Sequence, residues 1–299
     1  MPIAFRTYQN GDLFGADYRK VRDFLIKLDS PNYHFGRWDW MITHNHLDPS
    51  GLQKIGLWED CGKLVALATY DCSLGRAYLL TLPGYEGLFG EMLPYAKAAL
   101  QNGKGEFSVL IREGDLLWQD IAKNQGFFAT QNGEKDAIFP IDDWQSIKIG
   151  LPEGFAITSM EENFNLFKYG QVLWKGFDHE QNGEGIFVWK PQGLPERESE
   201  FLRPNVKLRL KVAVMAPNGD FVSYCGMWQD EGSRSALVEP VATDPAYRRM
   251  GLGKAAVLEA IRRCGQLGAK RAFVGSSQAF YYAIGFRPYQ SSSFWAVRD

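Results

Sequence analysis

Cysteine is scarce in this sequence, and its spacing excludes two classes of small, stapled fold. The 299 residues contain four cysteines, Cys61, Cys72, Cys225 and Cys264, and no two of them form a CxxC pair. This pattern argues against a zinc ribbon or a disulfide scaffold and is typical of proteins in a reducing cytoplasm. We therefore expect a cytoplasmic protein whose site holds no metal.

Long apolar runs are missing as well. No stretch approaches the roughly 20 residues that a membrane helix needs, and residues 1–6 lack the basic and apolar pattern of a signal peptide. Hydrophobic residues make up 45% of the chain and charged residues 23%, which is the composition of a globular protein rather than a disordered one. A length of 299 residues fits two domains, and we expect no membrane partner.

Acidic residues are nearly absent from one segment. Between Pro245 and Arg298, Glu259 is the only acid and stands against nine basic residues. The segment therefore carries +8, and a net charge of -2 for the chain leaves -10 on the remainder. A cationic segment in an acidic protein indicates a site for a bound polyanion rather than general affinity for nucleic acid. A nucleic-acid-binding protein is expected to have a basic domain. Chance clustering on a solvated helix face is the alternative.

The order of the expected elements is the same in the two halves of the chain. Each half begins with a strand and a helix, continues with three strands and a second helix, and ends with a strand and a short helix that runs into Gly-Phe. The expected strands are 3–8, 55–58, 64–70, 77–80 and 106–111, then 155–158, 208–215, 221–228, 235–243 and 271–274. Strands with helices between them predict an α/β (α+β) layered fold, and the repeat predicts an internal duplication.

A domain boundary is expected where the apolar pattern breaks. Asp142-Asp143, Gly150 and Pro152 interrupt it between residues 141 and 152. We therefore divide the chain into domains 1–149 and 150–299.

The segment after the strand 235–243 is the most informative. Asp244-Pro245 turns the chain, because the residue before a proline is pushed out of helical space. A helix then begins near Met250, with Gly251 and Gly253 in its first turn. Glycines there permit close approach to the backbone, and the exposed N–H groups form an anion site. Together with the basic residues Arg248, Arg249 and Lys254, they indicate a phosphate or diphosphate.

Two of the three known phosphate motifs fit poorly. A Walker A loop needs a glycine at Arg248 and a serine or threonine at Ala255. A dinucleotide fingerprint matches Gly251, Gly253 and Ala256 formally, but it requires an acid about 20 residues on, and none lies between Glu259 and Asp299. The third motif, [QR]-x-x-G-x-[GA], is satisfied by Arg248-Arg249-Met250-Gly251-Leu252-Gly253.

With the preceding Asp244-Pro245-x-Tyr247 and the downstream Tyr281-x-x-x-Gly285-Phe286, this motif resembles the acetyl-CoA signature of the GNAT superfamily of N-acetyltransferases. The resemblance covers residues 150–299 well and residues 1–149 in outline. The layout is similar to tandem members such as mycothiol synthase. It implies two tandem GNAT-like domains, each with a mixed, mostly antiparallel sheet flanked by helices.

The resemblance also implies roles for single residues. The pantetheine arm of acetyl-CoA should pair with the backbone of Val241, Ala242 and Thr243, and the Val241 amide should serve as oxyanion donor. The diphosphate should lie on the amides from Arg249 to Lys254. The expected cofactor-binding residues also include Arg248, Met250, Gly251, Leu252 and Gly253, and Ser276 where the family often places an asparagine.

Two side chains are candidates for proton transfer. Strand alternation places Glu239 on the face of Val241, so we expect its carboxylate to act as general base, directly or through water. A Glu239 that faces solvent is the alternative. Tyr281 is the candidate acid for the departing thiolate, because a phenol with a pKa near 10 protonates it at little cost. A packed aromatic side chain is the alternative for Tyr281.

The first half has a different loop at the corresponding position. Alignment of Pro83-x-Tyr85 with Pro245-x-Tyr247 places Glu86 at Arg248, Phe89 at Gly251 and Glu91 at Gly253. We therefore expect residues 1–149 to bind CoA poorly and to be structural or to shape the acceptor cleft.

Two aromatic segments are candidates for the acceptor pocket. They are residues 33–40, for which a buried aromatic layer is the favoured interpretation, and Trp174–Trp189. His44 and His46 form a weak metal pair without a third ligand nearby.

The sequence predicts an acetyl-CoA-dependent N-acetyltransferase that acts on a primary amine of a small molecule or peptide. The rival hypothesis is a catalytically silent acyl-CoA-binding regulatory module on the same fold. Acetyl-CoA is expected as co-substrate without a metal, and the protein is expected to be a monomer with an internal pseudo-dimer, or a homodimer.

Overall fold

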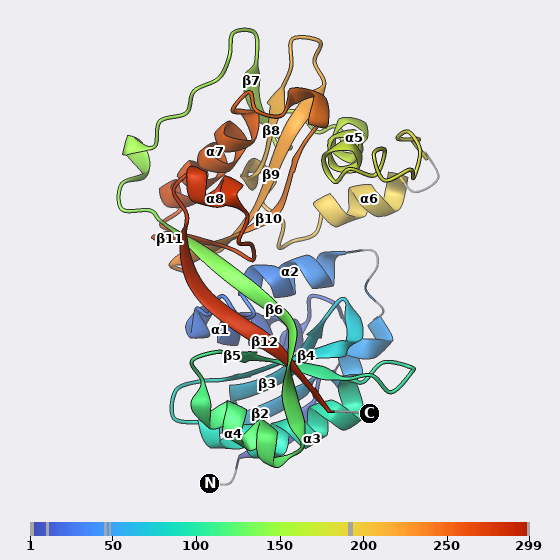
Figure 1. Cartoon of the computed structure of the whole chain (residues 1–299), viewed down its shortest axis with the longest axis vertical. Coiled ribbons are helices and arrows are strands. Elements are labelled where there is room, and N and C mark those ends of the chain that lie inside the picture. Colours follow the sequence, from blue (N-terminus) through green and yellow to red (C-terminus); the bar gives the residue numbers. More distant parts are fainter. Residues whose placement is uncertain (1–2, 10–11, 45–46, 48, 191–193, 298–299) are drawn as a thin grey trace. The chain divides into compact units, whose positions relative to one another are not determined.

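The computed structural model of the chain describes residues 3–9, 12–44, 47, 49–190 and 194–297 (Figure 1). The chain forms two compact units. Unit 1 comprises residues 1–137, 275–277 and 288–299, and unit 2 comprises residues 138–274 and 278–287. Each unit is described by itself.

The strands of unit 1 follow the order β1-β2-β3-β4-β5-β12-β6. Their bounds are β1 Ala4–Thr7, β2 Gly56–Asp60, β3 Lys63–Asp71, β4 Ser73–Thr81, β5 Ser108–Arg112, β6 Phe127–Pro140 and β12 Arg287–Val297. Neighbours from β1 to β4 are antiparallel, β4 and β5 are parallel, and β12 is antiparallel to β5. Helices α1 (Ala16–Leu28) and α2 (Phe35–Thr43) cover one face, and α3 (Phe89–Leu100) and α4 (Leu116–Asn124) cover the other (Figure 1).

Unit 2 repeats this arrangement, with the order β6-β11-β10-β9-β8-β7. Its elements are β7 Ala156–Ser159, α5 Leu166–Gly176, α6 Leu194–Phe201, β8 Lys211–Met215, β9 Phe221–Gln229, β10 Ser235–Thr243, α7 Leu252–Gln266, β11 Arg271–Val274 and α8 Ala279–Ala283. The strands β7 to β10 are antiparallel, and β10 and β11 are parallel. Helix α7 packs on one face of β8–β10 and α5 on the other (Figure 1).

The predicted fold class is confirmed, because each unit is a mixed, mostly antiparallel sheet flanked by helices in the same order. The strands expected at 235–243 and 271–274 have those bounds in the structure. Strands β6 and β12 and the helices α2 and α6 were not predicted. Polar residues dominate the exposed part of β6, so an apolar pattern did not reveal that strand.

The two units are not contiguous in sequence, because each half of the chain contributes to the sheet of the other. Strand β12, the last of the second half, pairs with β5 from Ser292↔Arg112 to Ala296↔Ser108. Strand β6 belongs to the first half of the chain, yet its end lies in unit 2. The structural units therefore differ from a simple division at residue 149, which remains a prediction about the roles of the two halves.

None of the helices in the described part of the chain is both long and apolar enough to span a bilayer. In the same residues, no cluster of three or more His, Cys, Asp or Glu side chains could hold a metal ion. His46 lies outside the described residues, so the His44–His46 pair is not seen.

A buried carboxylate anchors α7. Glu259 is 4% exposed and accepts hydrogen bonds from Arg262 Nε at 2.7 Å and Arg263 Nε at 2.7 Å. Burial works to raise the pKa of Glu259, but the bonds from Arg262 and Arg263 outweigh it and hold the pKa below its ordinary value. A second bond from Arg263 Nη1 to the Arg209 carbonyl oxygen connects α7 with the segment before β8.

We expect Glu259→Gln to lower the free energy of unfolding at pH 7 by about 1–3 kcal/mol, because both arginines lose a charged acceptor. A lowered folded-state pKa stabilises the fold above the unfolded-state value of about 4.3, and the stabilisation is lost as the pH falls through the folded-state pKa. Urea unfolding of wild type and variant should therefore converge in acid. Glu161→Gln, which changes an exposed carboxylate, is the control, and an equal loss in both variants would contradict this role.

The exchange of strands predicts that the halves do not fold alone. A fragment 150–299 lacks the end of β6 and leaves β12 without β5, so its exposed strand edges should make it insoluble or cause it to associate. Co-expression with fragment 1–149 should restore a soluble complex with the circular dichroism of the intact chain. A monomeric fragment 150–299 with the melting temperature of the intact protein would show that the exchange is dispensable.

Candidate functional site

The candidate site lies where β10 separates from β11. These parallel strands pair over three positions only, from Ser235↔Arg271 to Leu237↔Phe273. Strand β10 then continues to Thr243 along β9. Beyond Leu237, the edge of β10 that faced β11 has no strand partner in the described part of the chain.

The backbone of Val241 and Thr243 faces this open edge. The Asp244 amide donates to the Val222 carbonyl of β9 at 3.0 Å, and successive residues of a strand turn their backbone groups to opposite sides. Ala242 therefore faces β9, whereas Val241 and Thr243 face away from it. This is the edge at which the pantetheine arm is expected.

A bulge interrupts β10 at Glu239 and Pro240. Val238 pairs with Met227 and Val241 with Cys225, so three steps along β10 match two along β9. A Cβ on Gly226 would lie 2.5 Å from the Glu239 carbonyl oxygen, so only glycine allows β9 to approach the bulge this closely. Regular alternation does not extend across the bulge, and it therefore does not place Glu239 on the face of Val241. The Glu239 residue is exposed.

The loop after β10 leads into the N-terminus of α7. Asp244 is buried and accepts from the Ala246 amide at 3.0 Å, which fixes the turn. Arg249 and Gly251 have positive φ angles of 67° and 82°, and Gly251 is the N-cap of α7. The amides from Arg249 to Lys254 donate no backbone hydrogen bond to the described residues, so six donors are available to an anion.

Gly253 makes α7 approach β10 and α8 closely. A Cβ there would lie 3.0 Å from Thr243 Oγ1 and 3.4 Å from the Phe280 ring. The three residues bring together the predicted diphosphate loop, the open strand edge and the helix that carries Tyr281.

The three basic side chains of this loop differ in their contacts. Arg249 and Lys254 are exposed and form no ion pair with the described residues. The Arg248 guanidinium is instead bound to protein acceptors, which are the Thr243 carbonyl, the Gly176 carbonyl and the Asp178 carboxylate. Two of the three expected cations are therefore free for a phosphate.

Tyr281 is 8% exposed and packs between Phe280 and Phe286, with ring centroids at 5.1 and 5.4 Å. Burial raises the pKa of Tyr281 well above its ordinary value, and the nearby Cys225 and Glu239 raise it further. The raised pKa of Tyr281 favours the protonated phenol.

Cys225 is a residue of this site that the sequence did not reveal. It is fully buried on β9, opposite Val241, and burial raises its pKa so that it remains a thiol. A single cysteine without a motif gives no signal in a sequence. Ser276 belongs to unit 1, so its expected part in binding the cofactor stays a prediction.

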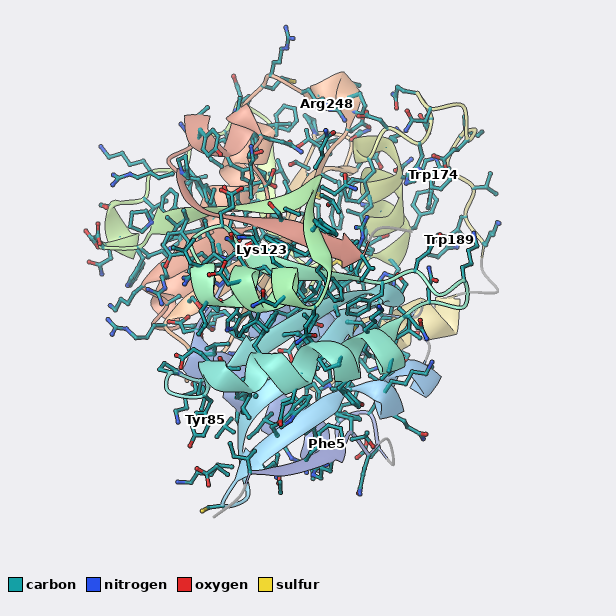
Figure 2. The ribbon with its side chains drawn as sticks, turned by 60° about the horizontal axis from the view of Figure 1, so that its bottom comes forward. Phe5, Tyr85, Lys123, Trp174, Trp189 and Arg248 are labelled. Atoms are coloured by element: carbon teal, nitrogen blue, oxygen red, sulfur yellow. The ribbon has the colours of Figure 1, made fainter. Side chains whose placement is uncertain are left out.

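The two aromatic segments differ in exposure. Tyr33, Phe35 and Trp38 are at most 1% exposed and belong to the core of unit 1, as the favoured interpretation predicted. By contrast, Trp174 and Trp189 lie in an aromatic group with Phe167 and Phe187 that is partly open to solvent (Figure 2). Of the two segments, the one formed by α5 and the residues after it therefore presents aromatic side chains to solvent.

The loop of unit 1 that corresponds to the diphosphate loop is closed by its own side chains. Phe89 is fully buried and stacks on Trp118 with ring centroids at 4.2 Å. The Glu86 carboxylate accepts from the Gly84 amide at 2.9 Å. Tyr85, labelled in Figure 2, donates to Asp60 Oδ2 at 2.7 Å. An acid and a buried ring thus occupy the positions of Arg248 and Gly251.

Comparisons with known proteins agree with this geometry. A family model described as "Acetyltransferase (GNAT) family" matches residues 174–286. No curated protein matches the chain in sequence.

Three solved structures are similar along nearly the whole chain. A tandem GNAT protein from the clavulanic acid biosynthesis pathway is 13% identical, with a TM-score of 0.61 and coverage of 99% of this chain and 98% of that one. An acetyltransferase of the GNAT family from Colwellia psychrerythraea is 10% identical, with a TM-score of 0.57 and coverage of 99% and 100%. A GCN5-related N-acetyltransferase from Sphaerobacter thermophilus is 14% identical, with a TM-score of 0.54 and coverage of 99% and 96%.

The chain therefore contains a segment, residues 174–286, that matches the GNAT acetyltransferase family, and the resemblance predicted from the sequence is confirmed for this segment. Its fold is that of a tandem GNAT protein, with two GNAT-like units in one chain.

Gly253→Val should disturb the site directly. A branched side chain would collide with Thr243 and Phe280, and overpacking of this kind costs about 1–3 kcal/mol. We expect a lower melting temperature and a smaller rise on addition of acetyl-CoA. Gly150→Val is the control, because nothing lies within 4 Å of a Cβ there. Unchanged stabilisation by acetyl-CoA in the Gly253 variant would argue against a close approach of the ligand at this helix end.

Proposed function

We propose that this protein transfers an acetyl group from acetyl-CoA to a primary amine of a small molecule or peptide. The observation that carries the proposal is the N-terminus of α7. Six unbonded amides, a glycine N-cap and the unpaired cations Arg249 and Lys254 lie next to an open strand edge. Amides and cations suit a diphosphate, and a free strand edge suits an extended amide-bearing chain, which are the two parts of CoA.

The proposed donor site uses the residues expected from the sequence. The diphosphate would lie on the amides of Arg249, Met250, Gly251, Leu252, Gly253 and Lys254. The pantetheine amides would pair with Val241 and Thr243, and Ala242 would support them from the strand.

The reaction would proceed by direct transfer. The ammonium of the acceptor loses a proton, and its nitrogen then attacks the thioester carbonyl. The C–N bond forms, the C–S bond breaks, and the remaining excess proton leaves the nitrogen. The Val241 amide would stabilise the oxyanion, because its N–H faces the open edge.

Two side chains would handle the protons. The exposed Glu239 would receive the protons of the amine through water, because it is open to solvent and near Tyr281. Tyr281 would protonate the departing thiolate. Its raised pKa keeps the proton on the phenol throughout the neutral and mildly alkaline range, and makes transfer to the thiolate more costly than from a phenol with a pKa near 10.

Unit 1 would have a structural role. Its closed loop, with Glu86 and the buried Phe89, leaves no anion site like that of unit 2. The acceptor would meet the aromatic segment Trp174–Trp189, which is partly open to solvent, rather than residues 33–40, whose Tyr33, Phe35 and Trp38 are buried in the core.

The test is release of CoA thiol from acetyl-CoA with a panel of amines: alkylamines, aromatic amines, amino sugars and dipeptides. We expect thiol release with at least one class, with Tyr281→Phe and Glu239→Gln slowing turnover by about 10²–10⁴-fold. Cys225→Ser is the control, because the buried Cys225 should stay protonated and take no part in the reaction. We expect this variant to keep the turnover of the wild type.

Tight binding of acetyl-CoA without thiol release by any amine would favour the silent acyl-CoA-binding module instead. Because the pKa of Tyr281 is raised, its deprotonation should not limit the rate below about pH 10, its ordinary value. A fall in rate near pH 8 that disappears in Tyr281→Phe would contradict the proposed acid.

A further inference from the structure

Arg248 is the first residue of the acetyl-CoA motif, yet its side chain does not face the predicted diphosphate position as a free cation. Its Nε donates to the Thr243 carbonyl at 3.2 Å. Its Nη2 donates to the Gly176 carbonyl at 3.0 Å and to Asp178 Oδ1 at 2.7 Å. One guanidinium thus joins the end of β10 to the end of α5.

The end of α5 is fitted to β10 at this point. A Cβ on Gly176 would lie 2.7 Å from Ala242 Cβ and 2.8 Å from the Thr243 nitrogen, so a larger residue has no room. Lys175 Nζ adds an ion pair to the buried Asp244 at 3.2 Å. The last turn of α5 is therefore connected to the end of β10 by two cationic side chains, Lys175 and Arg248.

The segment after α5 folds back on the helix as one small structure. The Trp174 ring stacks on His179 with centroids at 4.3 Å, and its Nε1 donates to the Gly185 carbonyl at 3.1 Å. The His179 Nδ1 lies 2.8 Å from Glu184 Oε1. The Phe187 amide donates to Glu180 Oε1 at 3.2 Å.

Asp178 is the residue of this segment that the loop after β10 holds. It has a positive φ of 63°, a conformation that costs free energy for a residue other than glycine, and its carboxylate is bound by Arg248. Phe177 and Ile186 are 47% and 77% exposed, so the segment presents apolar side chains to solvent. Figure 2 labels Arg248, and Trp174 of α5.

We infer that Arg248 is a positioning residue that holds the acceptor-side segment 176–189 in register with β10, and that Arg249 and Lys254 supply the charge for the diphosphate. The inference rests on the proposed function only where it assigns segment 176–189 to the acceptor site. The basic residues of this loop would thus have two roles: Arg248 binds protein acceptors, whereas Arg249 and Lys254 bind phosphate. Because binding couplings are reciprocal, acetyl-CoA that fixes the loop should also order segment 176–189.

The experiment compares Arg248→Ala, Asp178→Asn, the double variant Arg249→Ala/Lys254→Ala and the control Arg234→Ala. Arg234 is exposed in the same unit, and its side chain forms no hydrogen bond or ion pair with the described residues. Hydrogen exchange of residues 176–189 is measured with and without acetyl-CoA, and the affinity for acetyl-CoA is measured by titration calorimetry.

We expect exchange in 176–189 to accelerate by about tenfold in Arg248→Ala and Asp178→Asn, with the affinity for acetyl-CoA changed by less than about fivefold. The double variant should show the opposite, with weaker binding of acetyl-CoA and unchanged exchange in the free protein. With the best amine of the thiol-release panel, Arg248→Ala should raise the KM for the amine by about tenfold and leave the KM for acetyl-CoA nearly unchanged.

Loss of acetyl-CoA affinity in Arg248→Ala with unchanged exchange of 176–189 would overturn the inference and make Arg248 a phosphate ligand. If the wild-type protein fails to bind acetyl-CoA, the proposed function fails, but exchange of the free variants still tests the connection. Equal exchange in Arg248→Ala and Arg234→Ala would overturn the connection alone.

Discussion

The separation of β10 from β11 is the constraint on which the rest of the site depends. Because the two strands pair only as far as Leu237, the backbone of Val241 and Thr243 has an edge without a strand partner among the described residues. The same divergence leaves room for the loop that ends at Gly251, and Gly253 allows α7 to lie against Thr243 and Phe280. The divergence of β10 from β11 therefore brings the open edge of β10, the N-terminus of α7 and the helix that carries Tyr281 close together.

In unit 1 the same divergence of parallel strands is combined with a different loop. Its parallel strands β4 and β5 also pair over three positions only, from Arg76↔Ser108 to Tyr78↔Leu110. The difference lies in the loop before α3, where Phe89 fills the core against Trp118 and Glu86 bonds the Gly84 amide. The two units thus share a fold and differ in the loop before the helix, where a few side chains fill the space in unit 1.

The sequence predicted the features that depend on local pattern. The bounds of β10, the glycine start of α7 and the open Arg249 and Lys254 follow from apolar periodicity, glycine placement and charge. The bulge at Glu239 and Pro240 was not predicted, because alternation assumes an unbroken ladder. The three contacts of Arg248 depend on Gly176 and Asp178, about 70 residues earlier, and β12 reaches β5 across almost 200 residues. Such long-range pairings leave no mark in a local window.

The central claim is that the end of α7 binds the diphosphate of CoA through its amides, Arg249 and Lys254. The most direct measurement is calorimetric titration with acetyl-CoA and with S-acetyl-pantetheine, which carries the thioester arm without the diphosphate. The account predicts that wild type binds acetyl-CoA at least about 100-fold more tightly than the truncated thioester, because charge-assisted bonds to the phosphates are lost. It also predicts that this ratio shrinks in Arg249→Ala/Lys254→Ala. Equal affinities for the two thioesters in the wild-type protein would contradict the claim.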